Sequence, residues 1–451
     1  MRSPFEKRLI QQAYRFELDP NQAQEVLLAK SVGASRFVYN WGLAESQRVY
    51  ELTGKRPRLR DLKSALVPLK QGECPWLYEV SAHISQQALV DLDRAFQNFF
   101  KGLRGGPRRG FPRFKRKGER DSARLYEVEL GERKIKLPMI GQVRLKETRS
   151  ARGFEGRILS ATISRKADRW FVALAVERER EIVLPQPARK PSDVVGVDLG
   201  LKAAAVIHDG DTARIVEPTR ALRSNLTKLR RLDRQLARKQ RDSRNRAKAK
   251  LRRARLHYKI SCQRRDFLHR LSGELARTKP VVVLEDLNVQ GMRGNRFLAL
   301  SVGDAGMGEL RRQLEYKCEW YGSTLVVIDR FFPSTQLCSG CGTLNEQMKG
   351  LAGLQERSVD CTACGISLDR DENAALNIRR TGLLQLESAS LGSIPLPEGL
   401  REEACGEEGS GPSTIAAKPA SLKQEAKARR NPRRDPQIDE ETRQGAGLSH
   451  G

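Results

Sequence analysis

The sequence predicts a multidomain α/β protein, and three observations lead to that prediction. Two apolar stretches, 194–200 and 281–287, each carry a carboxylate near the end, which is typical of buried strands in a central sheet. Two Cys-x-x-Cys pairs lie between the last predicted strand and the last predicted helix. Short alternating patterns at 125–180, ahead of a proline-rich stretch, indicate a separate small barrel.

The N-terminal part is predicted to be a small β-barrel interrupted by helices. Residues 22–50 and 84–103 carry apolar side chains at helical spacing, whereas strand patterns stand before and after them. Prolines then mark a linker. The predicted divisions are a first barrel strand in 1–20, a helical insert in 21–110, the rest of the barrel in 111–183 and the linker in 184–192.

The C-terminal part is predicted to be one sheet domain that a ribbon divides. An early hairpin of strands is followed by single strands, and this order fits an RNase H-like sheet. The final stretch has few large apolar residues, so we expect it to be disordered. The predicted divisions are a first sheet segment in 193–330, the ribbon in 331–367, a second sheet segment in 368–386 and the disordered tail in 387–451.

Four cysteines have the spacing of a structural zinc site. Cys338 and Cys341 form one Cys-x-x-Cys, Cys361 and Cys364 form a second, and nineteen residues separate the pairs. Four thiolates at the corners of a tetrahedron are what structural Zn²⁺ requires, and such a site leaves no open position for chemistry. The sequence therefore predicts one zinc ion that folds a ribbon. The alternative is four unrelated buried cysteines.

The charge predicts a polyanionic partner. The chain has 83 Lys and Arg against 55 Asp and Glu, a formal net charge of +28. Nucleic acid is the expected partner, and an anionic membrane surface is the weaker alternative because the sequence has no lipidation motif or bilayer-spanning apolar run. The scattered remaining cysteines and the absence of a signal peptide predict a cytoplasmic, nucleoid-associated protein.

Three carboxylates are predicted to form a catalytic site. Asp198 and Glu285 stand near the ends of buried strands, and Asp371 stands where the last helix begins. Taken alone, Asp198 could cap a turn and Asp371 could cap a helix. Together they offer the hard oxygen ligands of a phosphodiesterase site with two Mg²⁺ ions, one activating water and the other stabilising the leaving oxygen.

Two basic stretches are predicted to contact nucleic acid. Segment 104–117 combines arginine and lysine with Phe111 and Phe114, and segment 219–278 reads as a helical hairpin with a basic outer face. In both stretches the alternative is a solvated basic surface. The candidate contacts are Arg108, Arg109, Arg113, Lys115, Arg116, Lys117, Arg252, Arg253, Arg264 and Arg265.

At these motifs the sequence resembles the TnpB family of transposon-encoded RNA-guided DNA nucleases, related to type V CRISPR effectors and Fanzor proteins. The resemblance runs from residue 9 to residue 384. It is carried by GFPRFK at 110–115, VGVDLG at 195–200, ARLHYKISCQRRDFLHRLS at 254–272, VVLEDLNV at 282–289, and CSGCG with CTACGISLDRDENAALNI at 338–378.

The resemblance implies a RuvC nuclease domain with Asp198, Glu285 and Asp371 as catalytic triad, and it favours Asp371 over Asp369 as the third carboxylate. It makes the four cysteines the zinc ribbon of a target-nucleic-acid-binding insert. The implied partners are a guide RNA and target DNA beside a short motif, with the protein a monomer in the ribonucleoprotein. The alternatives are a strand-transferring DNA transposase and a nuclease-inactive RNA-guided repressor.

Overall fold

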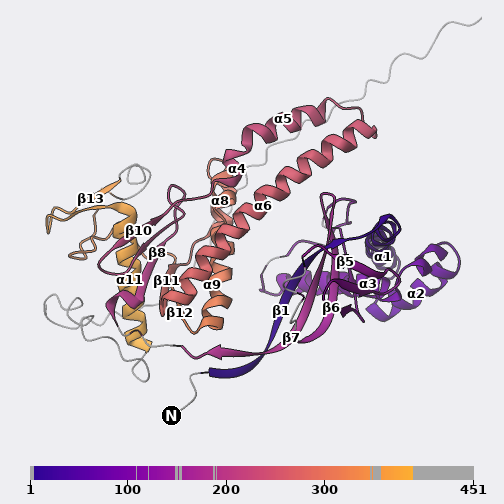
Figure 1. The fold of residues 1–451 in the computed structure, drawn as a ribbon, viewed down its shortest axis with the longest axis horizontal. Coiled ribbons are helices and arrows are strands. Elements are labelled where there is room, and N and C mark those ends of the chain that lie inside the picture. The colour runs from indigo at the N-terminus through magenta and orange to yellow at the C-terminus, as the bar shows by residue number, and fades with distance from the viewer. Residues whose placement is uncertain are drawn as a thin grey trace, which may run out of the picture. The chain divides into compact units, whose positions relative to one another are not determined.

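The structure is a computed structural model that describes residues 5–389, except 108, 120, 148–150, 152–154, 186–187, 189, 346–347 and 349–356. Arg108 among the candidate contacts lies outside the described residues, as do residues 390–451 of the predicted tail. Residues 387–389 belong to the last helix, so the helix extends past the predicted start of the tail. Figure 1 shows the arrangement of the elements.

The N-terminal strands form a seven-stranded antiparallel sheet in the order β2-β6-β7-β1-β5-β4-β3. The two long strands, β1 (Phe5–Asp19) and β7 (Arg169–Val183), pair along most of their length. The shorter strands are β2 (Ser122–Leu125), β3 (Glu129–Leu130), β4 (Lys134–Leu137), β5 (Gly141–Leu145) and β6 (Arg157–Lys166). The strands fall in the predicted regions, and closure of the sheet into a barrel stays a prediction.

Helices α1 (Gln22–Thr53), α2 (Leu59–Gln71) and α3 (Ala82–Leu103), with a 3-10 turn at Pro75–Glu79, separate β1 from β2 in the chain. The side chain of Asn21 accepts a hydrogen bond from the backbone N–H of Gln24 and caps α1. Gly54 ends α1 with a φ of 67°. Helix α2 has no counterpart among the predicted helices, because its apolar pattern is short and contains Pro68.

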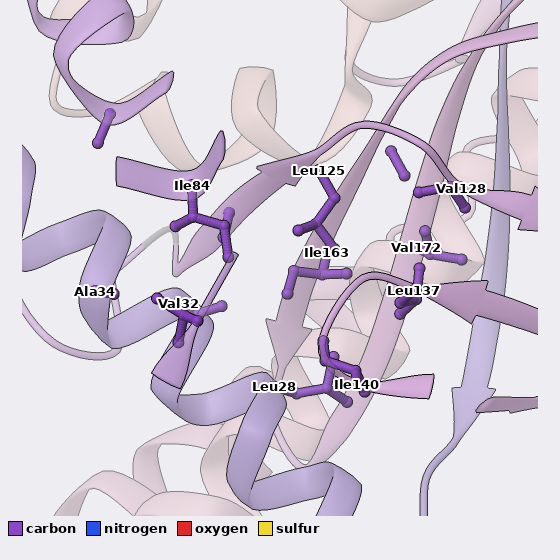
Figure 2. Close-up of a cluster of buried hydrophobic side chains, with 14 of the residues drawn as sticks. Leu28, Val32, Ala34, Ile84, Leu125, Val128, Leu137, Ile140, Ile163 and Val172 are labelled. Atoms are coloured by element: carbon purple, nitrogen blue, oxygen red, sulfur yellow. The ribbon is translucent and has the colours of Figure 1, made fainter. Parts of the chain in front are cut away.

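Apolar side chains from these helices and from the sheet share one core. Figure 2 shows Leu28 and Val32 of α1 and Ile84 of α3 on the side of the sheet that carries Leu125 and Ile163. Each of these five side chains is at most 4% exposed. The helical insert is therefore packed on the sheet, which accounts for its apolar spacing.

The C-terminal sheet has five strands in the order β10-β9-β8-β11-β12. Strands β8 (Val194–Asp198), β9 (Ala205–His208) and β10 (Ala213–Val216) are antiparallel neighbours. Strands β11 (Val281–Glu285) and β12 (Thr324–Ile328) continue the sheet parallel to β8. The predicted α/β sheet, with an early hairpin and later single strands, is confirmed.

Helices cover both faces of this sheet. Apolar side chains of α6 (Arg244–Thr278) and α9 (Met307–Tyr321) pack on one face, and those of α11 (Arg370–Ala389) pack on the other. Short elements connect them, namely a 3-10 turn at Pro191–Asp193, α4 (Ala221–Ser224), α7 (Val289–Gly294) and α8 (Ala299–Ala305). The near-continuous apolar runs of β8 and β11 follow from this burial on both faces.

The predicted helical hairpin consists of α5 (Leu226–Ala237) and the first half of α6, which run side by side in Figure 1. Leu229 and Leu232 of α5 pack against Leu256 and Ile260 of α6. The apolar seam is therefore confirmed. Among the helices of the described part of the chain, none combines the length and apolar character that crossing a membrane would require.

Candidate functional site

Strand alternation places Asp198 and Glu285 on the same face of the sheet. Successive side chains of a strand point to opposite faces. Val197 of β8 stands beside Leu284 of β11 in the parallel register, so the next residues of the two strands, Asp198 and Glu285, end neighbouring strands. Every second residue of β8 and β11 faces α11, and Asp198 and Glu285 are the last residues of these two series. The apolar cluster on that face contains Val194, Val281, Val283, Ile378 and Leu383.

Gly196 lets α11 approach β8 closely. A β-carbon at Gly196 would lie 2.0 Å from the carbonyl oxygen of Ala375, a backbone atom that cannot move aside freely. Asp371 stands one helical turn before Ala375, and Asp198 stands two residues after Gly196 on the same strand face. The close approach therefore brings Asp371 from α11 toward Asp198 from β8.

The two acids of the Asp-Arg-Asp motif have different surroundings. The Oδ1 atom of Asp369 accepts hydrogen bonds from the backbone N–H groups of Asp371 at 2.9 Å and Glu372 at 3.3 Å, which caps α11. The helix-capping role considered for Asp371 is therefore filled by Asp369. The Asp371 side chain is 17% exposed and pairs with Arg370 at 3.0 Å and with Arg357 at 3.7 Å.

Burial makes two of the carboxyls weak acids. Loss of solvation, with repulsion from Asp371 and Glu285, raises the pKa of Asp198 to about 7, although the Arg370 guanidinium opposes that shift. Loss of solvation, with repulsion from Asp286, raises the pKa of Glu285 to about 7. Burying ionised carboxylates is costly, and a bound cation would offset that cost at both positions.

The three carboxylates offer a donor set that suits Mg²⁺, which prefers hard oxygen ligands. Among the described residues, the four cysteines are the group whose ligand atoms all lie within 4.8 Å of one another. Asp198, Glu285 and Asp371 do not form such a group, so a metal at these carboxylates stays a prediction.

The raised pKa values predict how stability depends on pH in Mg²⁺-free buffer. Between pH 3.8, the ordinary pKa of an aspartate, and about 7, the folded chain binds protons at Asp198 more tightly than the unfolded chain does. Stability therefore falls as the pH rises through this window. We expect Asp198→Asn to unfold at a higher temperature than the unmodified chain at pH 8, and at a closer temperature at pH 5. Equal differences at both pH values in thermal scans would contradict this expectation.

Sequence analysis missed the polar groups that surround the carboxylates. Arg370 and Arg357 contact Asp371, and the Nε2 atom of His208 lies 3.5 Å from Oε1 of Glu372. His208 is 3% exposed, and its Nδ1 accepts a hydrogen bond from the backbone N–H of Gly210 at 3.0 Å. In the sequence, the position of Arg370 between Asp369 and Asp371 could have indicated a contact with a carboxylate. Nothing in the sequence around His208 indicated its contact with Glu372.

The four predicted zinc ligands come together between β12 and α11. The Sγ atoms of Cys338 and Cys364 lie 3.6 Å apart, as do those of Cys341 and Cys361. Tetrahedral zinc with Zn–S bonds of about 2.3 Å places its sulfurs about 3.8 Å apart, so the four thiols fit the ion. The predicted four-cysteine cluster is confirmed, and its metal stays a prediction.

Each cysteine pair forms a tight turn that ends in glycine. Gly342 and Gly365 have φ values of 76° and 75°, in the left-handed region that favours glycine. Their backbone N–H groups donate to the carbonyls of Cys338 and Cys361, both at 2.8 Å. A hairpin of β13 (Ser358–Asp360) and β14 (Ser367–Asp369) supports the second turn and leads directly into α11.

The candidate contacts of the glycine-rich segment are not all exposed. Arg109, Arg113, Arg116 and Lys117 are exposed. Lys115 instead lies with its ammonium 3.9 Å from the ring centroid of Tyr39, and burial lowers its pKa. The two candidate stacking residues, Phe111 and Phe114, are 45% and 51% exposed, and Phe111 also packs edge-on against Phe96 and Phe99.

The candidate contacts of the hairpin lie along α6. Arg252 and Arg265 are exposed, and Arg253 pairs with Asp233 of α5. Arg264 donates to the carbonyl of Gly303 at 2.7 Å. Arg264 and Arg265 also line a cavity of about 770 Å³, together with Arg293 of α7. This clustering of guanidinium groups suits a phosphate-rich ligand.

Three family models match separate parts of the chain. The model described as "Probable transposase" matches residues 172–296. The model described as "Cas12f1-like, TNB domain" matches residues 308–378, which contain the four cysteines and Asp371. The model described as "Helix-turn-helix domain" matches residues 10–55, which here hold the end of β1 and helix α1.

Curated proteins are similar over most of the chain. A Streptomyces pristinaespiralis protein named "Putative RNA-guided DNA endonuclease" is 37% identical over 379 residues, covering 83% of this chain and 90% of that protein. An Escherichia coli K12 protein named "Putative RNA-guided DNA endonuclease InsQ" is 32% identical over 395 residues, covering 83% of this chain and 93% of that protein. A cryo-EM structure of a Cas12f1–sgRNA–target DNA complex has a TM-score of 0.49 at 14% identity, covering 82% of this chain and 99% of that chain.

Proposed function

Because this chain belongs to the TnpB family, we propose that it is an RNA-guided DNA endonuclease that hydrolyses target DNA beside a short motif. The observation that carries the proposal is the approach of Asp371 on α11 to the carboxylates that end β8 and β11. Asp198, Glu285 and Asp371 are the proposed catalytic residues. Guide RNA, target DNA, two Mg²⁺ ions and one structural zinc ion are the proposed partners and cofactors.

Mg²⁺ at these carboxylates would supply an activated water and would stabilise the leaving oxygen of the phosphodiester. The chain contributes rigid positions for its ligands. Asp198 and Glu285 end neighbouring strands of a sheet that is packed on both faces, so the two carboxylates cannot drift apart. Arg370 favours the ionised form of Asp198 and pairs with Asp371, so it partly offsets the repulsion among the carboxylates.

The basic surfaces support roles for the other parts of the chain. The α5–α6 hairpin and the cavity that contains Arg264 and Arg265 are proposed to hold guide RNA along its phosphates. The N-terminal sheet and its helical insert are proposed to read the short motif on duplex DNA, while base pairing with the guide supplies sequence choice. This division follows the general logic of RNA-guided effectors.

One experiment tests the proposed function directly. The chain is coexpressed with RNA from its own locus, purified with the RNA that it retains, and mixed with DNA that matches that RNA. We expect Mg²⁺-dependent cleavage of the matched DNA and intact DNA when the matching sequence is scrambled. Joined donor–target products would favour the transposase, whereas matched binding without cleavage would favour the repressor.

Phosphate binding along α6 predicts a steep dependence of RNA affinity on salt. Replacing Arg252 and Arg265 with glutamine should reduce the slope of log affinity against log salt by about 0.7 for each single-strand phosphate that the protein no longer neutralises. The matched control is Arg48→Gln in α1, because the Arg48 guanidinium already pairs with Glu45 at 2.7 Å. Filter binding at several salt concentrations measures the slope for each protein. If the double variant has the same slope as the control, the hairpin does not bind the RNA phosphates as proposed.

A further inference from the structure

We propose that Asn373 and Asn377 are positioning residues that lock the first cysteine turn of the ribbon onto α11, so that zinc binding holds Asp371 in place. This inference rests on the proposed function for its activity readout. Its other readouts concern the backbone of α11 and do not depend on cleavage. The ribbon would then serve the nuclease site mechanically, in addition to any contact with nucleic acid.

The two asparagines grip the backbone on both sides of Cys338. The side-chain amide of Asn373 donates to the carbonyl of Leu337 at 2.7 Å, and its Oδ1 accepts from the N–H of Ser339 at 2.8 Å. The amide of Asn377 donates to the carbonyls of Leu337 at 2.7 Å and Ser334 at 2.8 Å. The flanking residues of one zinc ligand are therefore tied to one helix.

Spacing and burial make this clamp specific. Asn373 and Asn377 are four residues apart, so their side chains project from the same face of α11. They are 1% and 4% exposed, and water cannot readily replace the hydrogen bonds that they make. The neighbouring Ala374, Ala375 and Ile378 are fully buried. The asparagines thus face the ribbon while the other face of the same helix packs on the sheet.

The clamp belongs to a ring that closes through zinc. Asp369 ends β14 of the ribbon and caps the first turn of α11, which joins the second cysteine turn to the helix. Asn373 and Asn377 join the first cysteine turn to the same helix. The cysteine pairs of the two turns meet at the metal site. Removing zinc opens this ring where the two cysteine turns meet, so the turns no longer brace each other against the first turn of α11, which carries Asp371.

A double substitution tests the clamp with zinc present. Asn373→Leu with Asn377→Leu keeps the number and branching of the side-chain heavy atoms but removes every side-chain hydrogen bond from these two residues to residues 334–339. We expect one zinc per chain, binding of matched DNA within about twofold, and cleavage slower by about tenfold or a matching rise in the Mg²⁺ concentration at half-maximal rate. Thr381→Ala is the matched control, because the Thr381 hydroxyl donates a hydrogen bond within α11, to the carbonyl of Asn377 at 2.9 Å.

Hydrogen exchange tests the same coupling without cleavage. In the unmodified chain, zinc removal should speed exchange of the amides at the first turn of α11, including Asp371 and Glu372, by about tenfold or more. In the double variant, these amides should already exchange quickly with zinc bound. If zinc removal leaves exchange unchanged in the unmodified chain, the proposal is overturned, even where the variant folds poorly. If zinc removal speeds exchange in the unmodified chain as expected, but the unmodified chain with zinc cleaves no matched DNA, the clamp is supported and the proposed nuclease function is rejected.

Discussion

Asp198→Ala is expected to abolish cleavage of matched DNA while leaving RNA and DNA binding intact. Asp198 ends the central strand of the sheet and is the carboxylate that both Glu285 and Asp371 repel. Its loss removes one of the three carboxylates that would hold Mg²⁺, which corresponds to several kcal/mol of transition-state stabilisation and a rate decrease of about a thousandfold or more. Single-turnover cleavage and gel-shift binding, measured on the same preparation, separate the two effects.

Asp209→Asn provides the matched control for this experiment. Asp209 follows β9, and its Oδ1 accepts hydrogen bonds from the backbone and hydroxyl of Thr212, which the amide oxygen of asparagine can also accept. This variant loses one carboxylate from the turn after β9, together with its ion pair to Lys279 at 3.7 Å, and leaves the three proposed catalytic residues unchanged. Cleavage that survives in Asp198→Ala at the rate of the control would show that the catalytic assignment is wrong.

Cys338→Ser is expected to lower the zinc content from one ion per chain to nearly none. The Cys338 thiol is 1% exposed and lies 3.6 Å from that of Cys364, so it occupies one corner of the closed site. Structural zinc contributes about 10–16 kcal/mol of apparent binding free energy to small domains at pH 7, so its loss should destabilise the ribbon. Metal analysis and limited proteolysis of residues 331–369 measure the loss.

The control for the zinc experiment is Cys262→Ser, which changes a thiol on α6 that is outside the ribbon. This variant should keep its zinc and its resistance to proteolysis. An unchanged zinc content in Cys338→Ser would refute the four-cysteine site. Zinc loss from both variants would point to a general effect of thiol removal rather than to this cluster.

The C-terminal fold could be predicted from sequence because each strand carries its own signal. The runs at 194–198 and 281–285 are apolar up to a terminal acid, which predicts two buried strands. Only the parallel register of the two strands in the structure then shows that Asp198 and Glu285 share one face. The cysteine spacing likewise predicted which side chains meet. The prediction of the N-terminal part was less complete, because it missed α2, whose buried residues are Leu62 and Leu66.

The surroundings of the site could not be predicted, because they depend on contacts between distant segments. The hydrogen bonds of Asn373 and Asn377 reach more than thirty residues back along the chain, and asparagine in a helix gives no signal of its partner. Lys115 similarly had the composition of a phosphate contact, yet it packs on Tyr39. The charge of a segment predicts that its basic side chains lie at the surface. Which of these side chains packs against the protein instead depends on the fold.

The backbone contact between Gly196 and Ala375 has a consequence during synthesis of the protein. Strand β8 is synthesised long before α11. Until α11 has been made, the apolar side chains that it covers in the folded protein, Val194, Val281 and Val283, lack this packing partner. An incomplete chain therefore lacks the third carboxylate as well as the lid over its core. Under the proposed function, a chain that ends before α11 would lack the catalytic carboxylate Asp371 and would not cleave DNA.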